Sequence, residues 1–268
     1  MTTEYPIRMD IDGHTAFIVL NRPEKKNRMG LDFFSTLEGL VRKADEDPEI
    51  RVIVLRAEGP VFTAGLDLME AGSLLSDASA SGRETLRKHI LGLQNSFSSL
   101  ETCSKPVIAA VNGPCIGGGV DLICACDIRI ATQNAWFSIR ETRVAIIADL
   151  GTLQRLHHIV GYGMAAELAL TGRDFNASEA LEMGLLSRVL PDEAALGEAA
   201  RAIASDIAAL SPLAVQGVKD VLRFSRDHDV ATGLSYVAQK NAALLLSEDL
   251  MEAFAAFSEK RAPQFKGR

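Results

Sequence analysis

The sequence predicts an α/β fold in which parallel strands alternate with helices. Two continuous apolar runs, residues 52–55 and 107–111, are typical of strands buried on both faces of a sheet. The segment between them, roughly residues 84–100, has the pattern of a helix. A strand, a helix and a second strand in this order predict a parallel pair joined by a crossover.

The N-terminal part is expected to add a hairpin and a helix. Residues 7–20 contain two strand-like runs separated by Asp12-Gly13, a frequent two-residue turn signal. Apolar residues at helical spacing follow at 31–41. Between them, the loop 21–28 holds four basic residues within seven positions, which fits either a solvated loop or an anion site.

Both buried strands lead into related sequences, which predicts an internal repeat. The shared pattern is Gly-Pro followed by Gly, Asp and Leu at equal offsets. The first copy has Gly59-Pro60, Gly65, Asp67 and Leu68, and the second has Gly113-Pro114, Gly119, Asp121 and Leu122. Repeated strand–turn–helix units place similar loops side by side, so the two loops can supply two backbone amides to one oxygen.

The C-terminal half is expected to be mostly helical. Strands are predicted at 128–131 and 135–139, and helices from 149 to 184. Further helices are predicted at 193–210, 213–226, 230–246 and 249–260. Pro212 falls at a helix start, where proline costs little. This alanine-rich, amphipathic tail is either a partner surface or further cover for the core.

The bulk composition excludes several classes of protein. The net charge of -7, with no long block of like charge, argues against a nucleic-acid surface. The cysteines at 103, 115, 124 and 126 are expected to be buried free thiols, since no second ligand pair completes a zinc site. No stretch approaches the ~20 apolar residues of a membrane span, and residues 1–6 do not resemble a leader. We therefore expect a cytoplasmic protein.

A glycine-rich turn with carboxylates around it is the strongest functional signal. Residues 112–121 follow the second apolar run, and backbone amides at such a turn can hold a developing oxyanion. Glu141 and Asp149 lie further along and can move protons. Together they predict proton transfer next to a carbonyl. Each feature has a structural alternative: a turn that merely needs glycines, a surface glutamate at 141, a helix N-cap at 149 and a first-turn helix acid at 121.

The two turns resemble the two signatures of the crotonase (enoyl-CoA hydratase/isomerase) superfamily. Residues 62–68 carry the first signature and residues 112–122 the second, and the likeness extends from 21–23 to 260–266. A narrower likeness is to the Δ3,5-Δ2,4-dienoyl-CoA isomerase branch. It is carried by residues 119–122, 126–129, 141, 148–156, 225–228 and 236–238. Ordinary hydratases usually have a glycine-rich segment in place of 148–150 and Glu in place of Asp121.

The resemblance implies a spiral of repeated ββα units over residues 1–195 and a helical trimerisation region over 196–268. Trimers in this superfamily often pair into hexamers. The implied substrate is an acyl-CoA thioester, with coenzyme A as part of the substrate and neither a cofactor nor a metal required. The thioester carbonyl would lie between the amides of Leu66 and Gly118. The implied coenzyme A contacts are Lys25, Lys26, Ala64, Gly65, Asp67, Leu68 and Lys260.

The narrower likeness implies an isomerase with three carboxylates. Glu141 would take a proton from C2, Asp149 would deliver one to C6, and Asp121 would tune the other two or hold a water. The apolar neighbours of Asp149, namely Ile146, Ile147, Ala148 and Leu150, are expected to desolvate it and raise its pKa. The nearest alternative is a 2-enoyl-CoA hydratase that uses Asp121 and Glu141 to activate water. A non-catalytic scaffold is the more distant one. The serine- and glycine-rich segment 69–83 is expected to be mobile.

Overall fold

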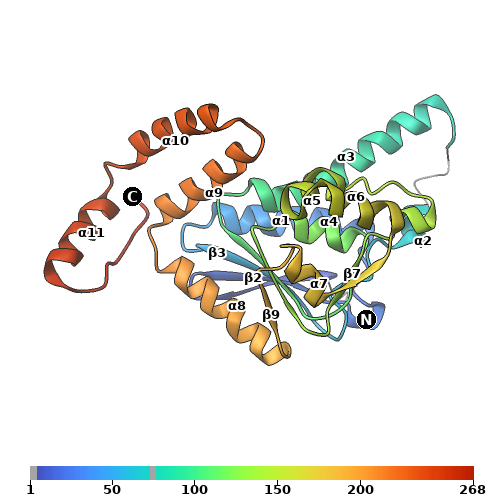
Figure 1. Cartoon of the computed structure of the whole chain (residues 1–268), viewed down its shortest axis with the longest axis horizontal. Helices are drawn as coiled ribbons and strands as arrows, with labels where there is room; N and C mark the ends of the chain where they lie inside the picture. The colour runs from blue at the N-terminus through green and yellow to red at the C-terminus, as the bar shows by residue number, and fades with distance from the viewer. Residues whose placement is uncertain (1–4, 73–76) are drawn as a thin grey trace.

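The computed structural model describes residues 5–72 and 77–268, and its main element is a six-stranded sheet (Figure 1). The strand order is β1-β2-β3-β4-β6-β9, and only the β1·β2 pair is antiparallel. The strands are β1 (Ile7–Asp12), β2 (Thr15–Leu20), β3 (Val52–Ala57), β4 (Val107–Val111), β6 (Ile128–Thr132) and β9 (Arg188–Leu190). The predicted α/β class is confirmed.

The predicted crossover is present between β3 and β4. Helix α3 (Ala80–Thr102) connects the two strands, which pair in parallel with Ile53 opposite Val107. The hairpin is also confirmed, although its turn is formed by Gly13 and His14, one residue later than expected, because Asp12 still pairs with Thr15. Of the segment expected to be mobile, Leu68–Gly72 forms helix α2, and residues 73–76 lie outside the described residues.

Helices cover both faces of the sheet, which explains the apolar runs in its strands. On one face, α1 (Leu31–Glu46) and α3 pack together, with the rings of Phe34 and Phe97 5.2 Å apart. On the other face lies α8 (Glu193–Ala208). Its buried residues recur every fourth position, at Leu196, Ala200, Ala204 and Ala208, so one stripe of the helix contacts the strands.

The two repeated turns lie against each other, as the internal repeat predicts. Thr63 pairs in parallel with Cys115. The Thr63 amide donates to the Pro114 carbonyl at 3.1 Å, and the Ile116 amide donates to the Thr63 carbonyl at 3.1 Å. Gly113 packs so closely on Pro60 that a Cβ at position 113 would lie 2.2 Å from the Pro60 carbonyl oxygen. The glycine at this point is therefore required by the contact between the repeats.

A second, smaller sheet follows the second turn. It has three short strands, β5 (Cys115–Ile116), β7 (Trp136–Ser138) and β8 (Asp174–Asn176), in the order β5-β7-β8. Strand β8 contradicts the expectation of helices from 149 to 184. Only Phe175 of its three residues is buried, stacked on Phe137 at 5.4 Å between ring centroids, and one apolar residue is too short a pattern to indicate a strand.

The chain also forms several short helices outside the two sheets. They are η1 (Pro23–Lys25), α4 (Gly118–Cys124), η3 (Glu141–Val144), α5 (Thr152–Val160), α6 (Tyr162–Thr171) and α7 (Ala177–Glu182). All seven residues of α4 are buried. Helix α5 begins three residues later than expected, at Thr152.

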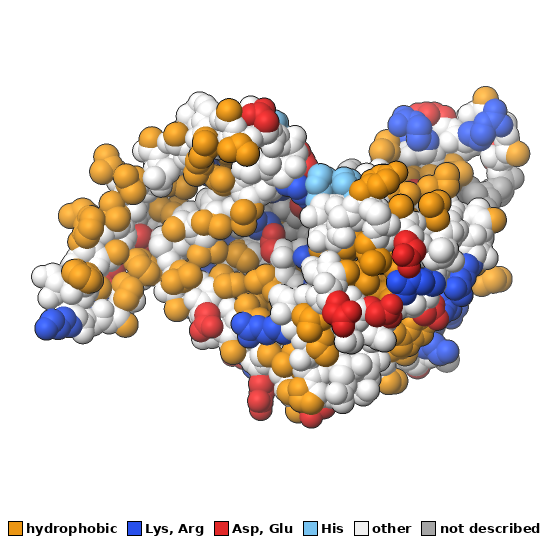
Figure 2. All heavy atoms as spheres, viewed as in Figure 1, with side chains coloured by type: hydrophobic (Ala, Val, Ile, Leu, Met, Phe, Trp, Pro, Cys, Tyr) orange, Lys and Arg blue, Asp and Glu red, His pale blue; other side chains and the backbone are white. Residues whose placement is uncertain are grey.

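The last three helices extend away from the sheet (Figure 1). They are α9 (Pro212–Arg226), α10 (Val230–Leu244) and α11 (Glu248–Glu259), close to the expected ranges and with Pro212 in the first turn of α9. Figure 2 shows hydrophobic side chains gathered over this region. The expected boundary at 195/196 falls inside α8, and the division into two regions stays a prediction. Within the described ranges, no helix is long and apolar enough to cross a membrane.

Candidate active site

Two backbone amides lie next to each other where the repeated turns meet. A Cβ built on Gly118 would lie 3.8 Å from the Leu66 nitrogen, and one built on Gly65 would lie 3.6 Å from the Gly118 nitrogen. Gly118 is the first residue of α4, so its amide has no acceptor within the helix. Neither amide donates a backbone hydrogen bond to any other residue in the described ranges. The pair is therefore available to an anionic oxygen.

The loop before α1 holds the Leu66 amide in place. The Met29 amide donates to the Gly65 carbonyl at 2.9 Å, and the Asp67 amide donates to the Met29 carbonyl at 2.9 Å. Met29 also contributes its side chain, because a Cβ at Gly118 would lie 2.9 Å from its Cε atom. These bonds on both sides of Leu66 fix its amide before any ligand arrives, which is the preorganisation that oxyanion stabilisation requires.

Glu141 opens η3 and lies against the glycine-rich turn. A Cβ at Gly117 would lie 3.1 Å from its Oε1 atom, and Gly117 has φ 55°, so this position favours glycine on two grounds. The Oε2 atom of Glu141 is buried and has no hydrogen-bond partner among the described residues. Burial raises the pKa of Glu141 to about 7, with the charges of Asp121 and Asp149 acting in the same direction. A carboxylate with such a pKa suits a general base at neutral pH.

Asp121 is almost fully buried within α4, with 1% of its surface exposed. Its Oδ1 atom accepts the backbone amide of Thr152 at 2.6 Å, at the first position of α5. Burial raises the pKa of Asp121 to about 6, the bond from Thr152 opposes this rise, and the charge of Asp149 adds to it. Asp121 is thus a first-turn acid of α4, and it also binds the start of a second helix.

Asp149 is half-buried in the segment between η3 and α5. It does not cap α5, because the N-cap position is Gly151 and the amide of Thr152 is bound by Asp121. The structural alternative weighed for Asp149 is therefore wrong. Burial raises the pKa of Asp149 above its usual value, as expected.

The apolar neighbours of Asp149 differ from expectation in part. Ala148 and Leu150 are buried, with 5% of their surface exposed. Ile146 and Ile147 are 39% and 75% exposed, so neither shields Asp149 strongly within a single chain. Burial is the cause of the raised pKa of Asp149, and the segment that carries it is held in place by a hydrogen bond to its backbone. The Gln94 side chain donates to the Asp149 carbonyl oxygen at 2.6 Å.

The three carboxylates form one cluster. The charge of Asp121 acts on Glu141, and the charge of Asp149 acts on both of the others. Like charges at short range disfavour simultaneous ionisation, so the cluster holds protons at pH values where isolated carboxyl groups have lost them. Carboxyl groups that can exchange protons, next to this pair of amides, would permit proton transfer beside a carbonyl.

The candidate coenzyme A residues lie in two separate places. Lys25 and Lys26 are exposed at the end of η1, and the Lys26 carbonyl accepts the amide of Ala64 at 3.0 Å. The loop is thereby joined to residues 64–68, where the Asp67 carboxylate is 3.5 Å from Arg28 and Leu68 is 50% exposed. Lys260 caps the end of α11, and Figure 1 places that helix at the opposite end of the molecule from α2. Within one chain, Lys260 does not join the others.

The structure gives roles to residues for which the sequence analysis proposes none. Met29, Gln94 and Thr152 hold the amide pair and the Asp149 segment, and Gly117 gives room to Glu141. Gly117 lies within the predicted glycine-rich turn, so its spacing was a usable signal. The other three lie on separate elements, and no local pattern identifies them.

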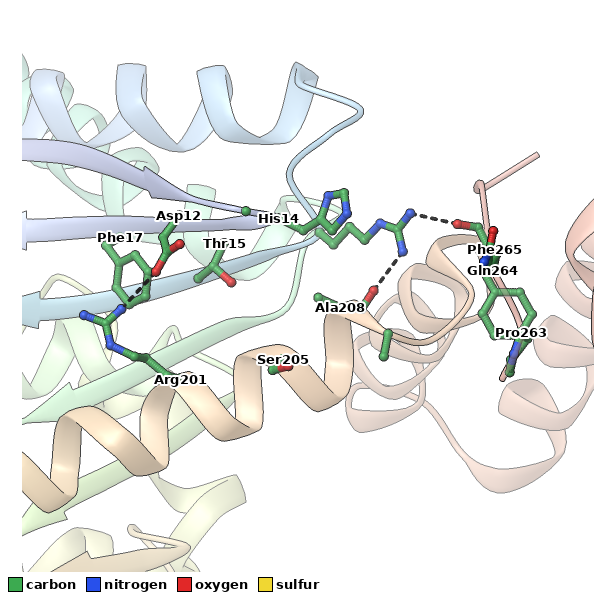
Figure 3. A pocket seen from close by; sticks show the side chains of 13 residues that line it. Asp12, His14, Thr15, Phe17, Arg201, Ser205, Ala208, Pro263, Gln264 and Phe265 are labelled. Atoms are coloured by element: carbon green, nitrogen blue, oxygen red, sulfur yellow. Dashed lines mark hydrogen bonds and ion pairs between the residues drawn. The ribbon is translucent and has the colours of Figure 1, made fainter. Parts of the chain in front are cut away.

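A cavity of about 610 Å³ lies away from this cluster, and its described lining contains none of the three carboxylates. Figure 3 shows it between the β1·β2 hairpin, α8 and the C-terminal segment. Arg51 donates there to the carbonyls of Ala208 and Phe265, both at 2.8 Å. These bonds tie the end of the chain to the core, so we assign the cavity to that junction.

Comparisons with known proteins identify the relatives of this chain. The sequence profile described as enoyl-CoA hydratase/isomerase matches residues 10–268. The peroxisomal Δ(3,5)-Δ(2,4)-dienoyl-CoA isomerase of Arabidopsis thaliana is 46% identical over 97% of this chain and 95% of its own. The mitochondrial enzyme of that name from Dictyostelium discoideum is also 46% identical, over 94% of this chain and 87% of its own.

A solved structure shows the same fold. Enoyl-CoA hydratase from Bacillus anthracis superposes with a TM-score of 0.91 and 35% sequence identity, covering 98% of this chain and 100% of that one. The fold predicted from the resemblance, a spiral of ββα units followed by C-terminal helices, is confirmed. The paired amides, the carboxylate cluster and these similarities lead to one conclusion: the chain belongs to the enoyl-CoA hydratase/isomerase (crotonase) family and is an enzyme of that superfamily.

Proposed function

We propose that the protein isomerises 3,5-dienoyl-CoA thioesters to 2,4-dienoyl-CoA thioesters. The observation that carries the proposal is a second titratable acid, Asp149, in the same cluster as the base Glu141 and with a raised pKa. A shift of two conjugated double bonds needs a proton removed at one carbon and another delivered four carbons away. The similarity to dienoyl-CoA isomerases supports the same choice.

The first step is removal of a C2 proton by the Glu141 carboxylate. The electron pair of the broken C–H bond moves into the thioester, and the negative charge develops on the carbonyl oxygen. The amides of Leu66 and Gly118 donate to that oxygen, and one such donor is typically worth about 3 kcal/mol of transition-state stabilisation. Because neither amide has another backbone acceptor, no internal hydrogen bond has to break.

The second step is delivery of a proton from the Asp149 carboxylic acid to C6. The electrons of the conjugated trienolate flow back from the oxygen toward C6, which leaves double bonds at C2 and C4. One proton has then left C2 and one has joined C6, with Glu141 protonated and Asp149 ionised. Exchange with water restores both. Asp121 acts through its charge, raising the pKa of Glu141, and through its bond to Thr152.

A 2-enoyl-CoA hydratase is the second candidate, and the hydratase from Bacillus anthracis favours it. In that reaction Asp121 and Glu141 would both activate a water. Asp121 is poorly suited to this, because it is 1% exposed and one of its oxygens is bound by Thr152. Comparing kcat/KM for 3,5-dienoyl-CoA isomerisation with kcat/KM for crotonyl-CoA hydration decides between the two. A much larger value for hydration would overturn our choice.

The coenzyme A half of the substrate is proposed to lie along the loop 22–28 and residues 64–68. Lys25 and Lys26 serve the phosphates as mobile point charges. Coenzyme A enters as part of the substrate and leaves as part of the product with the thioester bond intact, so the proposal needs no separate cofactor. Lys260 lies at the far end of its own chain and would act on the substrate of a neighbouring subunit. Free buried cysteines are compatible with a reducing compartment such as the cytoplasm, and that location remains a prediction.

We propose further that a second copy of this chain covers the C-terminal helices, in a homotrimer that can pair into a hexamer. An apolar groove of about 410 Å³ lies between α9, α10 and α11. Large apolar side chains on these helices are exposed, including Val218, Leu222, Val230, Leu234, Phe254 and Phe257. Such a surface on an arm that leaves its own sheet is typical of an interface. Sedimentation equilibrium tests this, and a monomer at micromolar concentration would contradict it.

A further inference from the structure

We infer that Glu101 and Arg155 are positioning residues for Asp149, and that Arg226 links this pair to the C-terminal helices. The inference rests on the acid role proposed for Asp149. The segment that carries Asp149 has no helix or strand of its own between η3 and α5. Its position therefore depends on the contacts that neighbouring elements make with its backbone.

Arg155 makes the most extensive of these contacts. Its side chain is 10% exposed, and its Nη1 atom lies 3.4 Å from the Leu150 carbonyl oxygen. A Cβ at Gly151 would lie 1.7 Å from the same Nη1 atom, so the guanidinium occupies the space beside the Gly151 Cα. Gly151 has φ 128°, a backbone conformation that favours glycine. Leu150 and Gly151, the two residues after Asp149, therefore both pack against the Arg155 guanidinium.

Glu101 of α3 fixes that guanidinium. One carboxylate oxygen accepts from both Nη2 and Nε of Arg155, at 2.9 and 3.1 Å. Ser98 accepts a further bond from Nη2 at 2.9 Å. Burial alone would raise the pKa of Glu101, but hydrogen bonds from Arg155 and Arg226 lower it below its usual value. Glu101 is thus ionised at neutral pH and holds Arg155 by a charge-assisted pair.

Arg226 reaches the same carboxylate from α9. Its Nη1 atom pairs with the other oxygen of Glu101, and its Nε pairs with Asp227 at 2.8 Å. A continuous chain of ionic contacts therefore runs from α9 through α3 to α5, and it ends at the carbonyl next to Asp149. Loss of the central carboxylate leaves two arginines without their shared partner, and the segment loses its support. Small displacements of a reacting group reduce rates strongly, by up to about a hundredfold for 1 Å.

The test separates the C6 step from the C2 step on the same substrate. The wild type and the Glu101→Gln variant are given 3,5-dienoyl-CoA in D₂O. Isomerisation is followed by absorbance, and exchange of C2 protons in unreacted substrate is followed by NMR. The Asp149→Asn variant is the reference for loss of the acid that protonates C6. In it, the rate of isomerisation should fall while exchange of the C2 protons persists. Glu84→Gln is the matched control, because it breaks an exposed 2.8 Å ion pair with Arg87 on the same helix, α3.

We expect Glu101→Gln to lower the rate of isomerisation at least tenfold while C2 exchange stays within twofold of wild type. Gly151→Ala displaces the guanidinium from the other side and should give the same pattern, so it replaces Glu101→Gln if that variant does not fold. A parallel fall in isomerisation and exchange would show general damage and overturn the inference, as would no change in either. A wild type that does not isomerise 3,5-dienoyl-CoA would instead refute the proposed function.

Discussion

The Glu141→Gln variant is expected to resist unfolding better than the wild type above pH 7 and to lose that advantage in acid. The pKa of Glu141 rises from 4.5 to about 7, chiefly through burial and further through the charge of Asp121. The folded wild type thus binds more protons than the unfolded chain between these pH values. Its stability falls as pH rises through this window. The difference corresponds to about 3 kcal/mol of unfolding free energy.

Urea unfolding at about pH 4.5 and about pH 8, at one protein concentration, measures this effect. The glutamine side chain places an amide where Oε2 of Glu141 already lacks a hydrogen-bond partner. The effect of this amide on the free energy of unfolding is nearly independent of pH. It cancels when the variant-minus-wild-type difference at one pH is subtracted from that at the other. We expect that double difference to reach about 3 kcal/mol in favour of the variant at the higher pH.

Glu38→Gln, which changes an exposed glutamate on α1, provides the control and should give a double difference near zero. An equal advantage of Glu141→Gln at both pH values, or a greater one in acid, would show that Glu141 is not a desolvated carboxylate. The assignment of Glu141 as a base tuned to neutral pH would then lose its physical support.

Three further predictions concern the rest of the site and the helix that supports it. Asp121→Asn removes a negative charge near Glu141, so the acidic limb of the kcat/KM profile for isomerisation should move below about pH 7 but stay above 4.5; an unmoved limb would contradict the coupling. Gly117→Ala places a Cβ 3.1 Å from Oε1 of Glu141 at a φ of 55°, and kcat should fall at least tenfold with the fold retained by circular dichroism. Lys219→Met removes a buried ammonium group that donates to the carbonyls of Leu100 and Lys105, both at 2.8 Å, and thermal unfolding should show a loss of about 1–3 kcal/mol; no measurable loss would refute its structural role.

The sequence predicted those features that depend on local pattern. The continuous apolar runs identified β3 and β4 because helices cover both faces of the sheet. The repeated Gly-Pro spacing predicted that the two turns lie side by side, which the pairing of Thr63 with Cys115 confirms. The strands β8 and β9 escaped prediction because each is short and has at most one buried residue, so no apolar run marks it, whereas the equally short β7 lies within an apolar run.

The site was predictable only where its chemistry is local or shared with a family. The amides of Leu66 and Gly118 followed from the repeat and the resemblance together. The bond from Thr152 to Asp121 joins residues 31 positions apart on different helices, and nothing in either segment indicates it. Glu101 and Arg155 likewise meet through the packing of α3 on α5. Such contacts depend on tertiary arrangement, which a single sequence does not encode in any short pattern.

The most direct test of the central claim is the position of solvent deuterium in the product. The wild-type enzyme converts 3,5-dienoyl-CoA in D₂O, and NMR locates the incorporated label. Delivery of a proton by Asp149 predicts 2,4-dienoyl-CoA with deuterium at C6. A 2,5-dienoyl-CoA product with deuterium at C4, or a hydrated product, would contradict the account.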